Sequence, residues 1–288
     1  MDFRTTSPCV AAALSTAASA GELRQPAAPE TAPWVASWTA SPQPIWGPDF
    51  PFPTNIPPSV GDASFRQVLR LSLGGSRLQV ELSNAYGERP LHIGAIHVAI
   101  SAGGSRIAAG SDLVLTFGGR PDAVIPPGAP LSSDPIDLEV PNLASLAVTV
   151  YLPEETALTT FHWDGRQTAY FGKGNQVVAK EIASGFAGET TTGARILLSA
   201  VSVEPKQQAA LVVALGDSIT DGNGVAQDSN QRWPDRLAER LALRNVAVVN
   251  AGVSGAHLLG DRMGVNALAR FDRDVLAQPG IKDTSNNN

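Results

Sequence analysis

An apolar run that ends in a polar turn constrains the fold of this chain most. Residues 211–215 form an uninterrupted apolar run, which is followed by Gly-Asp-Ser at 216–218 and by Asp-Gly at 221–222. Such a run is typical of a strand buried in a parallel sheet, and the glycine and polar residues after it are typical of a tight turn. Open α/β sheets bind their ligands at this end of a strand. The pattern therefore predicts an α/β unit with a site beside Ser218.

The residues after this turn continue the alternation of helix and strand. Asp228-Ser229-Asn230 offers a helix N-cap, and Trp233, Leu237 and Leu241 fall on one helical face, with Pro234 in the first turn. Residues 246–249 predict a second buried strand. Residues 263–277 predict a second helix, with Leu268, Phe271, Val275 and Leu276 at helical spacing before Pro279-Gly280. The β-α-β-α order is that of a doubly wound parallel sheet.

Two motifs in this region resemble the SGNH, or GDSL, hydrolases. Gly-Asp-Ser at 216–218 is similar to block I of that family, which implies that Ser218 is the nucleophile and that Asp217 supports the turn. Val-Val-Asn-Ala-Gly-Val-Ser-Gly at 248–255 is similar to block II, which implies that the Gly255 N–H donates to an oxyanion. A serine at a helix start lies beside free N–H groups that suit an oxyanion. The alternative is that Ser218 merely caps the helix.

The resemblance implies hydrolysis of carboxylic esters through an acyl-enzyme on Ser218, in a three-layer, flavodoxin-like domain. Acetyl groups on plant polysaccharide are one substrate class it implies, and lysophospholipids are the neighbouring one. The family's Asp-x-x-His and Gly-x-Asn-Asp motifs are missing from this sequence. His257 is a poor substitute base, because no acid near it in the sequence would orient it. We therefore expect an incomplete hydrolase domain and a truncated form of low or no activity.

The N-terminal residues predict export. Residues 1–20 contain Arg4, a short apolar core and Ala18-Ser19-Ala20, which together are typical of a signal peptide; a disordered Ala/Ser-rich tail is the alternative. Residues 21–33 are rich in Pro, Ala and charge, as a linker is. The sole cysteine, Cys9, lies in the signal segment, so disulfides, cysteine-ligated metals and thiol catalysis are excluded for the mature chain. We expect a secreted or periplasmic protein.

Between the linker and the apolar run, the apolar residues recur with period two. Residues 77–83 alternate cleanly, and similar strands are predicted at 93–100, 112–117, 136–140, 146–152 and 195–203. Short strands with Gly/Pro turns and no convincing helix predict an antiparallel β-sandwich of jelly-roll type. We therefore divide the chain into a β-sandwich domain at 34–206 and the first half of the hydrolase domain at 207–288. Segments 159–162 and 167–170 also resemble β-domains that precede some SGNH hydrolases.

The sandwich offers candidate ligands of its own. His92 and His97 stand at odd spacing on one predicted strand and so point to opposite faces, and His162 lies near Asp164. A metal site needs several converging ligands, so we interpret these histidines as structural. Trp34, Trp38 and Trp46 offer either a sugar-stacking platform or wall packing under a Pro-rich loop. The alternative function is accordingly a non-catalytic glycan-binding protein with a vestigial hydrolase half.

Composition and motif details exclude other classes. The net charge is -6, which argues against a nucleic-acid partner, and no run after the signal segment is long enough to span a bilayer. No Gly-Lys-Ser/Thr phosphate loop occurs, and Gly222-Asn223-Gly224 lacks the third glycine of a dinucleotide fingerprint. Thr220 stands where an α/β-hydrolase elbow has glycine. We expect an ester substrate, small or polysaccharide, and no cofactor, metal or membrane partner.

Overall fold

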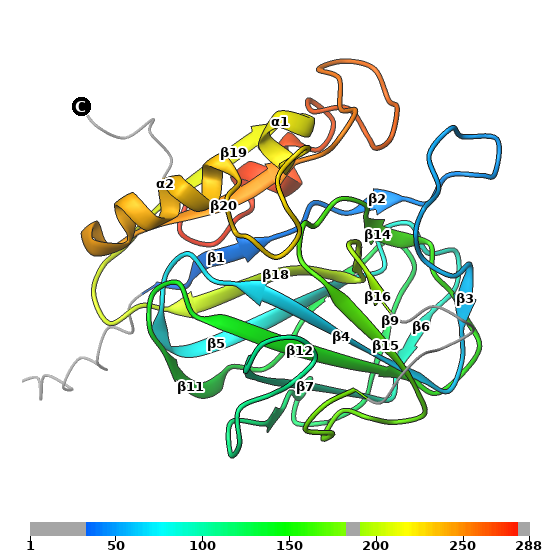
Figure 1. The fold of residues 1–288 in the computed structure, drawn as a ribbon, viewed down its shortest axis with the longest axis horizontal. Helices are drawn as coiled ribbons and strands as arrows, with labels where there is room; N and C mark the ends of the chain where they lie inside the picture. The colour runs from blue at the N-terminus through cyan, green and yellow to red at the C-terminus, as the bar shows by residue number, and fades with distance from the viewer. Residues whose placement is uncertain (1–32, 183–190, 282–288) are drawn as a thin grey trace, which may run out of the picture. The chain divides into compact units, whose positions relative to one another are not determined.

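A computed structural model describes residues 33–182 and 191–281 of the chain. The predicted signal peptide and all but Pro33 of the predicted linker lie outside the described residues, as does the tail 282–288. Residues 33–182 and 191–281 belong to one compact unit, which holds both the β-rich region and the segment that follows it. The two regions can therefore be described together (Figure 1).

The region from 35 to 204 is built on two antiparallel sheets that face each other across an apolar core. One sheet has the order β1-β18-β5-β10, with β11 also on β5. Its strands are Val35–Thr39, Leu198–Glu204, Gly75–Ser83, Pro130–Ser132 and Ile136–Val140. The other has the order β16-β15-β4-β12-β7-β8. Its strands are Thr191–Thr192, Ala169–Lys173, Ala63–Arg70, Ser145–Leu152, Ala95–Ile100 and Leu113–Val114.

Short ladders complete this region. They pair β13 with β3, β14 with β17 and β2, and β6 with β9. Their bounds are Thr156–Ala157, Ser59–Val60, Thr160–His162, Arg195–Ile196, Gln43–Pro44, Leu91–Ile93 and Ala123–Ile125.

The core follows from alternation along the strands. In β5, Leu78, Val80 and Leu82 are fully buried, while the residues between them are more exposed. They meet Phe65 of β4 and Val148 of β12 in the same apolar cluster. One face of each sheet is therefore apolar, as the period-two pattern requires. The expectation of a β-rich N-terminal region is confirmed.

Some predicted strands differ from those in the structure. The strand expected at 93–100 is split at Gly94 into β6 and β7, which pair in different sheets. A Cβ on Gly94 would lie 2.9 Å from Tyr151 Cδ1, so the chain crosses another strand closely there. The strand expected at 195–203 breaks at Leu197, whose φ is 60°. The strand expected at 112–117 is only Leu113–Val114.

The segment after the sandwich contains two parallel strands, β19 (Ala210–Gly216) and β20 (Val246–Gly252). They pair in register from Ala210 with Val246 to Gly216 with Gly252, so both carboxyl ends lie side by side. Helices α1 (Ser218–Asp221) and α2 (Trp233–Leu241) connect them, with the 3-10 turn η1 (Ala242–Arg244) before β20. A π-helical turn, η2 (Asp272–Leu276), follows. The parallel strand order agrees with the sequence pattern.

The buried face of α2 is not the predicted one. Pro234 and Ala238 are buried, whereas Trp233 is 44 % exposed and Leu237 is only half-buried. The small side chains let α2 approach β20 closely, so the large apolar residues lie at its flank. The predicted N-cap at 228–230 is also wrong, because Arg232 caps the helix and pairs with Asp235.

The helix predicted at 263–277 is reduced to the π-helical turn η2. Its predicted apolar face is largely outside the core: Leu268, Phe271 and Leu276 are 65 %, 37 % and 54 % exposed. Arg270 and Asp274 are buried instead and form an ion pair. The buried side of this segment is therefore ionic, which helical periodicity of apolar residues cannot indicate.

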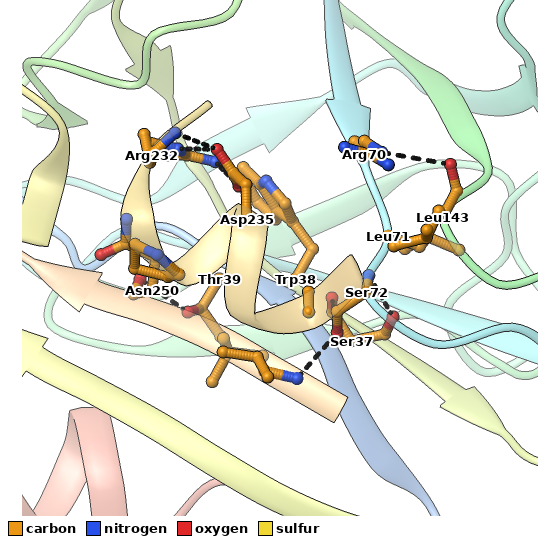
Figure 2. Close-up of a pocket in the computed structure, with 14 residues that line it drawn as sticks. Ser37, Trp38, Thr39, Arg70, Leu71, Ser72, Leu143, Arg232, Asp235 and Asn250 are labelled. Carbon is orange, nitrogen blue, oxygen red and sulfur yellow. Dashed lines mark hydrogen bonds and ion pairs between the residues drawn. The ribbon is translucent and has the colours of Figure 1, made fainter. Parts of the chain in front are cut away.

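Strand β1 of the sandwich lies against β20 and joins the two regions (Figures 1 and 2). Thr39 Oγ1 donates to the Asn250 carbonyl at 2.9 Å, and the Val248 N–H donates to Ser72 Oγ at 3.1 Å. Ser72 Oγ in turn donates to the Ser37 carbonyl at 2.8 Å. Hydroxyl groups of the sandwich thus satisfy the outer edge of β20. Beside them, apolar residues of both regions form a small second core: Val35, Leu73, Ala209 and Ala247.

None of the helices in the described part of the chain is long and apolar enough to cross a membrane.

We expect Ser72→Ala to lower the free energy of unfolding by about 1–3 kcal/mol, because the buried Val248 N–H loses its acceptor. Urea unfolding monitored by circular dichroism measures this. Ser76→Ala, on an exposed position of β5, is the matched control and should change the value by less than about 0.5 kcal/mol. Equal effects of the two substitutions would contradict the role of Ser72 at this edge.

Candidate active site

Ser218 begins helix α1 directly after β19, but it is not the cap of that helix. Asp217 is the N-cap, and its Oδ1 accepts a hydrogen bond from the Ile219 N–H at 3.0 Å. Ser218 is half-buried, and its Oγ forms no hydrogen bond within the described residues, while Ile219 beside it is 76 % exposed. The capping alternative for Ser218 is therefore wrong, and its hydroxyl is left for other chemistry.

Two glycines let the strand ends pack tightly on α1. A Cβ on Gly216 would lie 2.2 Å from Thr220 Oγ1, and a Cβ on Gly252 would lie 2.3 Å from the Asp221 N. The Asn250 side-chain amide also donates to the Thr220 carbonyl at 2.8 Å. The turn that carries Ser218 is consequently held by both strands.

Gly255 lies in the turn that follows β20. Its φ is +73°, a left-handed conformation that favours glycine, and the Ala256 N–H donates to the Val253 carbonyl at 3.0 Å across the turn. A Cβ on Gly255 would lie 2.8 Å from Met263 Sδ. The Val253 N–H donates to the Gly216 carbonyl at 3.1 Å. This turn is thereby joined to the end of β19, next to the Asp217-Ser218 turn.

A buried arginine lies at the carboxyl ends of both strands. Arg270 is 2 % exposed, and its guanidinium donates to the Ala251 carbonyl at 2.7 Å and to the Gly216 carbonyl at 3.1 Å. Asp274 pairs with it at 2.8 Å and with Arg273 at 2.6 Å. Sequence reasoning missed this pair; the i,i+4 spacing of opposite charges was the available signal. Arg270 stabilises the strand ends on which the Ser218 and Gly255 turns begin.

A buried histidine of the sandwich contacts the helix of Ser218. His162, on β14, has Nε2 3.0 Å from Asp221 Oδ1 and Nδ1 3.0 Å from the Ser41 carbonyl. Asp221 Oδ2 accepts hydrogen bonds from the Ser254 N–H and from Ser254 Oγ, both at 2.7 Å. The prediction that His162 is a hydrogen-bonded buried histidine is confirmed, but its partner Asp221 is distant in sequence.

These three residues are not a catalytic triad. In a triad the histidine lies between the serine and the acid and takes the serine's proton. Here the acid lies between Ser254 and His162, and all three residues are at most 4 % exposed. No substrate can reach Ser254, and His162 cannot act on its hydroxyl.

The electrostatic environment of His162 favours its charged form. Burial lowers its pKa, but the charge of Asp221, hydrogen bonds to Asp221 and Ser41, and the charge of Asp164 outweigh burial. The net result is a pKa of His162 raised above its ordinary value of 6.5. Asp164 itself pairs with Arg166 at 2.8 Å.

The other histidines have partners other than Ser218. His257 is exposed, and its Nε2 is 3.5 Å from Arg262 Nη1. His92 and His97 do not share a strand as predicted: they lie on β6 and β7, because the chain changes sheet at Gly94. His97 Nδ1 pairs with Asp112 at 2.8 Å. In residues 33–182 and 191–281, no group of three or more His, Cys, Asp or Glu side chains is arranged to hold a metal ion.

The three tryptophans proposed as a sugar platform go to separate places. Trp38 is buried in the sandwich core, and Trp34 lies against the Arg77 guanidinium. Trp46 packs on Phe50, Phe161 and Trp163, and its Nε1 donates to the Phe52 carbonyl at 2.6 Å. No ring contact within the described residues joins two of the three. The packing alternative is therefore the one the structure supports.

Two cavities near the junction differ in size. The one beneath α2, lined by residues such as Trp38, Arg70 and Asn250, has a volume of about 20 Å³ and holds no more than a water (Figure 2). The other has a volume of about 430 Å³ and lies between the outward-facing Glu81 and Ser199 of the sandwich and residues 273–279. Ser218 lines neither cavity.

Comparison with known protein families finds a match for the C-terminal segment. Residues 214–281 match the sequence model of the GDSL-like Lipase/Acylhydrolase family. A search of the curated proteins found no match to the chain. The matched segment runs from β19 to the end of the described residues and contains Asp217, Ser218 and Gly255. It supports the resemblance to SGNH/GDSL ester hydrolases for this segment and does not include the sandwich.

We expect the stability conferred by the charge of His162 to depend on pH. A group whose pKa is raised by folding stabilises the fold below its unfolded pKa, and this contribution is lost as pH rises through the folded pKa. The stability of the wild type relative to His162→Gln, which cannot titrate, should be full below about pH 6.5 and should decline above it. Urea midpoints of both proteins from pH 5 to 9 measure this, and a constant difference would contradict it.

Proposed function

We propose that this protein is a serine esterase of the SGNH/GDSL type. The family match over residues 214–281 carries the proposal. The position of Ser218 supports it: the residue follows β19, and Asp217 rather than Ser218 caps α1. The close packing of the Gly255 turn on the end of β19 adds a second backbone N–H source in the same region.

In the proposed reaction, Ser218 Oγ attacks the carbonyl carbon of a carboxylic ester. Negative charge develops on the carbonyl oxygen, and the backbone N–H groups of Ser218 and Gly255 stabilise it. The carbon–oxygen bond to the alcohol then breaks, and the alcohol leaves with a proton. Water attacks the acyl-enzyme, which releases the acid and restores Ser218.

The reaction needs a group that takes the proton of Ser218. His162 is buried against Asp221 and Ser41, and His257 is exposed beside Arg262, so neither is hydrogen-bonded to Ser218. Because neither histidine is placed as the base, we propose that water or hydroxide takes the proton of Ser218. Without a positioned base, the rate falls by about 10²- to 10⁴-fold. A low activity is therefore part of the proposal.

We also propose a substrate class and a location for the protein. Acetyl esters on carbohydrate are the substrate class we favour, and export to a secreted or periplasmic location is proposed from residues 1–20. Glycan binding by the sandwich without catalysis is the rival function.

We expect p-nitrophenyl acetate to acetylate Ser218 slowly and to a maximum of one equivalent per chain. Intact-mass spectrometry over hours, followed by peptide mapping, measures the acetyl adduct and its position. Ser218→Ala should abolish the adduct, because its oxygen nucleophile is gone.

Ser229→Ala, in the loop after α1, is the matched control and should acetylate like the wild type. Equal acetylation of the wild type and Ser218→Ala would refute the esterase proposal. Retention of both proteins on an insoluble polysaccharide in that case would favour glycan binding.

A further inference from the structure

One short segment of the sandwich, residues 162–168, contacts α1 and the loop that follows it. Besides His162, Thr168 donates from both N–H and Oγ1 to the Asp228 carboxylate at 2.6 Å, and Gln167 donates to Asn230 Oδ1 at 2.8 Å. Arg166 donates to the Val225 carbonyl at 3.0 Å. These four residues all bind α1 or the loop after it.

The contact made by His162 differs from the others because both of its side chains, His162 and Asp221, are buried and ionisable. Its two ring nitrogens face the Ser41 carbonyl and the Asp221 carboxylate, and both of these groups only accept hydrogen bonds. A neutral imidazole has one donor and one acceptor nitrogen, so it would satisfy one partner only. With both nitrogens protonated, His162 donates to both partners.

Asp221 transmits this contact to the Gly255 turn. One carboxylate oxygen accepts from His162, and the other accepts from the N–H and the hydroxyl of Ser254. Asp221 lies three residues after Ser218, and Ser254 immediately precedes Gly255. The Asp221 carboxylate therefore links the Ser218 turn to the Gly255 turn. The proposed reaction needs these two turns to keep a fixed distance and orientation. Without a cation beside it, a carboxylate buried to this degree is costly.

We propose that His162 is a positioning residue of the esterase site, which holds the Gly255 turn against α1 through Asp221. The inference rests on the proposed function, since it assigns a role in that reaction to a residue of the sandwich. His162 touches no reacting atom. The facing charged groups are Asp221 on α1, and Asp164 and Arg166 on its own segment, which pair with each other. The cation that balances Asp221 is thus His162 itself.

The test compares His162→Leu with His162→Gln. Leucine removes the donor, while the glutamine amide keeps a donor near the position of Nε2. His97→Leu is the matched control, because it removes the other histidine–aspartate pair of the sandwich, 2.8 Å from Asp112. Should His162→Leu fail to fold, Asp221→Asn replaces it, since one amide oxygen cannot accept all the bonds of the carboxylate.

The first readout is the labelling rate of Ser218 by a fluorophosphonate. Ser218 Oγ bonds to phosphorus, fluoride leaves, and the hydroxyl proton passes to solvent. We expect His162→Leu to slow labelling on the order of 10²-fold, as for a catalytic group misplaced by about 1 Å. His162→Gln restores the donor but not the charge, so it should label faster than His162→Leu and more slowly than the wild type. His97→Leu should label like the wild type. An unchanged rate in His162→Leu would overturn the proposal.

The second readout is hydrogen exchange followed by mass spectrometry, which does not require activity. We expect faster exchange in His162→Leu at residues 217–223 and 252–257, with β4 and β12 unchanged. Equal acceleration throughout the sandwich would mean that His162 only stabilises the fold, and it would overturn the proposal. If the wild type labels no faster than Ser218→Ala, the esterase proposal is wrong. The exchange pattern still tests whether His162 holds the Gly255 turn against α1.

Discussion

A parallel sheet must be covered, and in this protein the sandwich covers one edge of β20. Parallel strands are buried because their polar edges and apolar faces both need partners. Thr39 and Ser72 satisfy that edge with side-chain hydroxyls, where another strand would use its backbone. The small apolar cluster around Val35 and Ala247 lies beside them. The two regions consequently form one packed body rather than two independent ones.

Buried charge at the strand ends has a complementary role. Arg270 donates to carbonyls at the carboxyl ends of both strands, and Asp274 pairs with it. Asp221 accepts from the Ser254 turn, and His162 balances it. Each buried ion is thereby paired and hydrogen-bonded, as burial demands. Both pairs lie around the turns of Ser218 and Gly255, so they fix the geometry of the proposed site.

The sequence predicts the elements better than it predicts their contacts. Alternation in β5 and the apolar run of β19 indicated the strands. The expected burial of β19 is wrong, however, because Ala214 is the one buried residue of this strand and Val212 is 36 % exposed. The sequence could not predict the buried side of residues 263–277, where Arg270 and Asp274 replace the expected apolar face. The His162–Asp221 contact joins residues 59 positions apart, so no local pattern indicates it. Ser218 and Gly255 came from motif resemblance, whereas the residues that hold them needed the structure.

The most direct test of this account is a crystal structure of the protein carrying a phosphonate on Ser218. The phosphonate mimics the tetrahedral intermediate of ester hydrolysis. The account predicts a phosphonyl oxygen about 2.7–3.1 Å from the Gly255 N, with the Asp221–Ser254 and Asp221–His162 hydrogen bonds intact. An adduct on Ser218 whose oxygen points away from Gly255, or an adduct on a different residue, would contradict it.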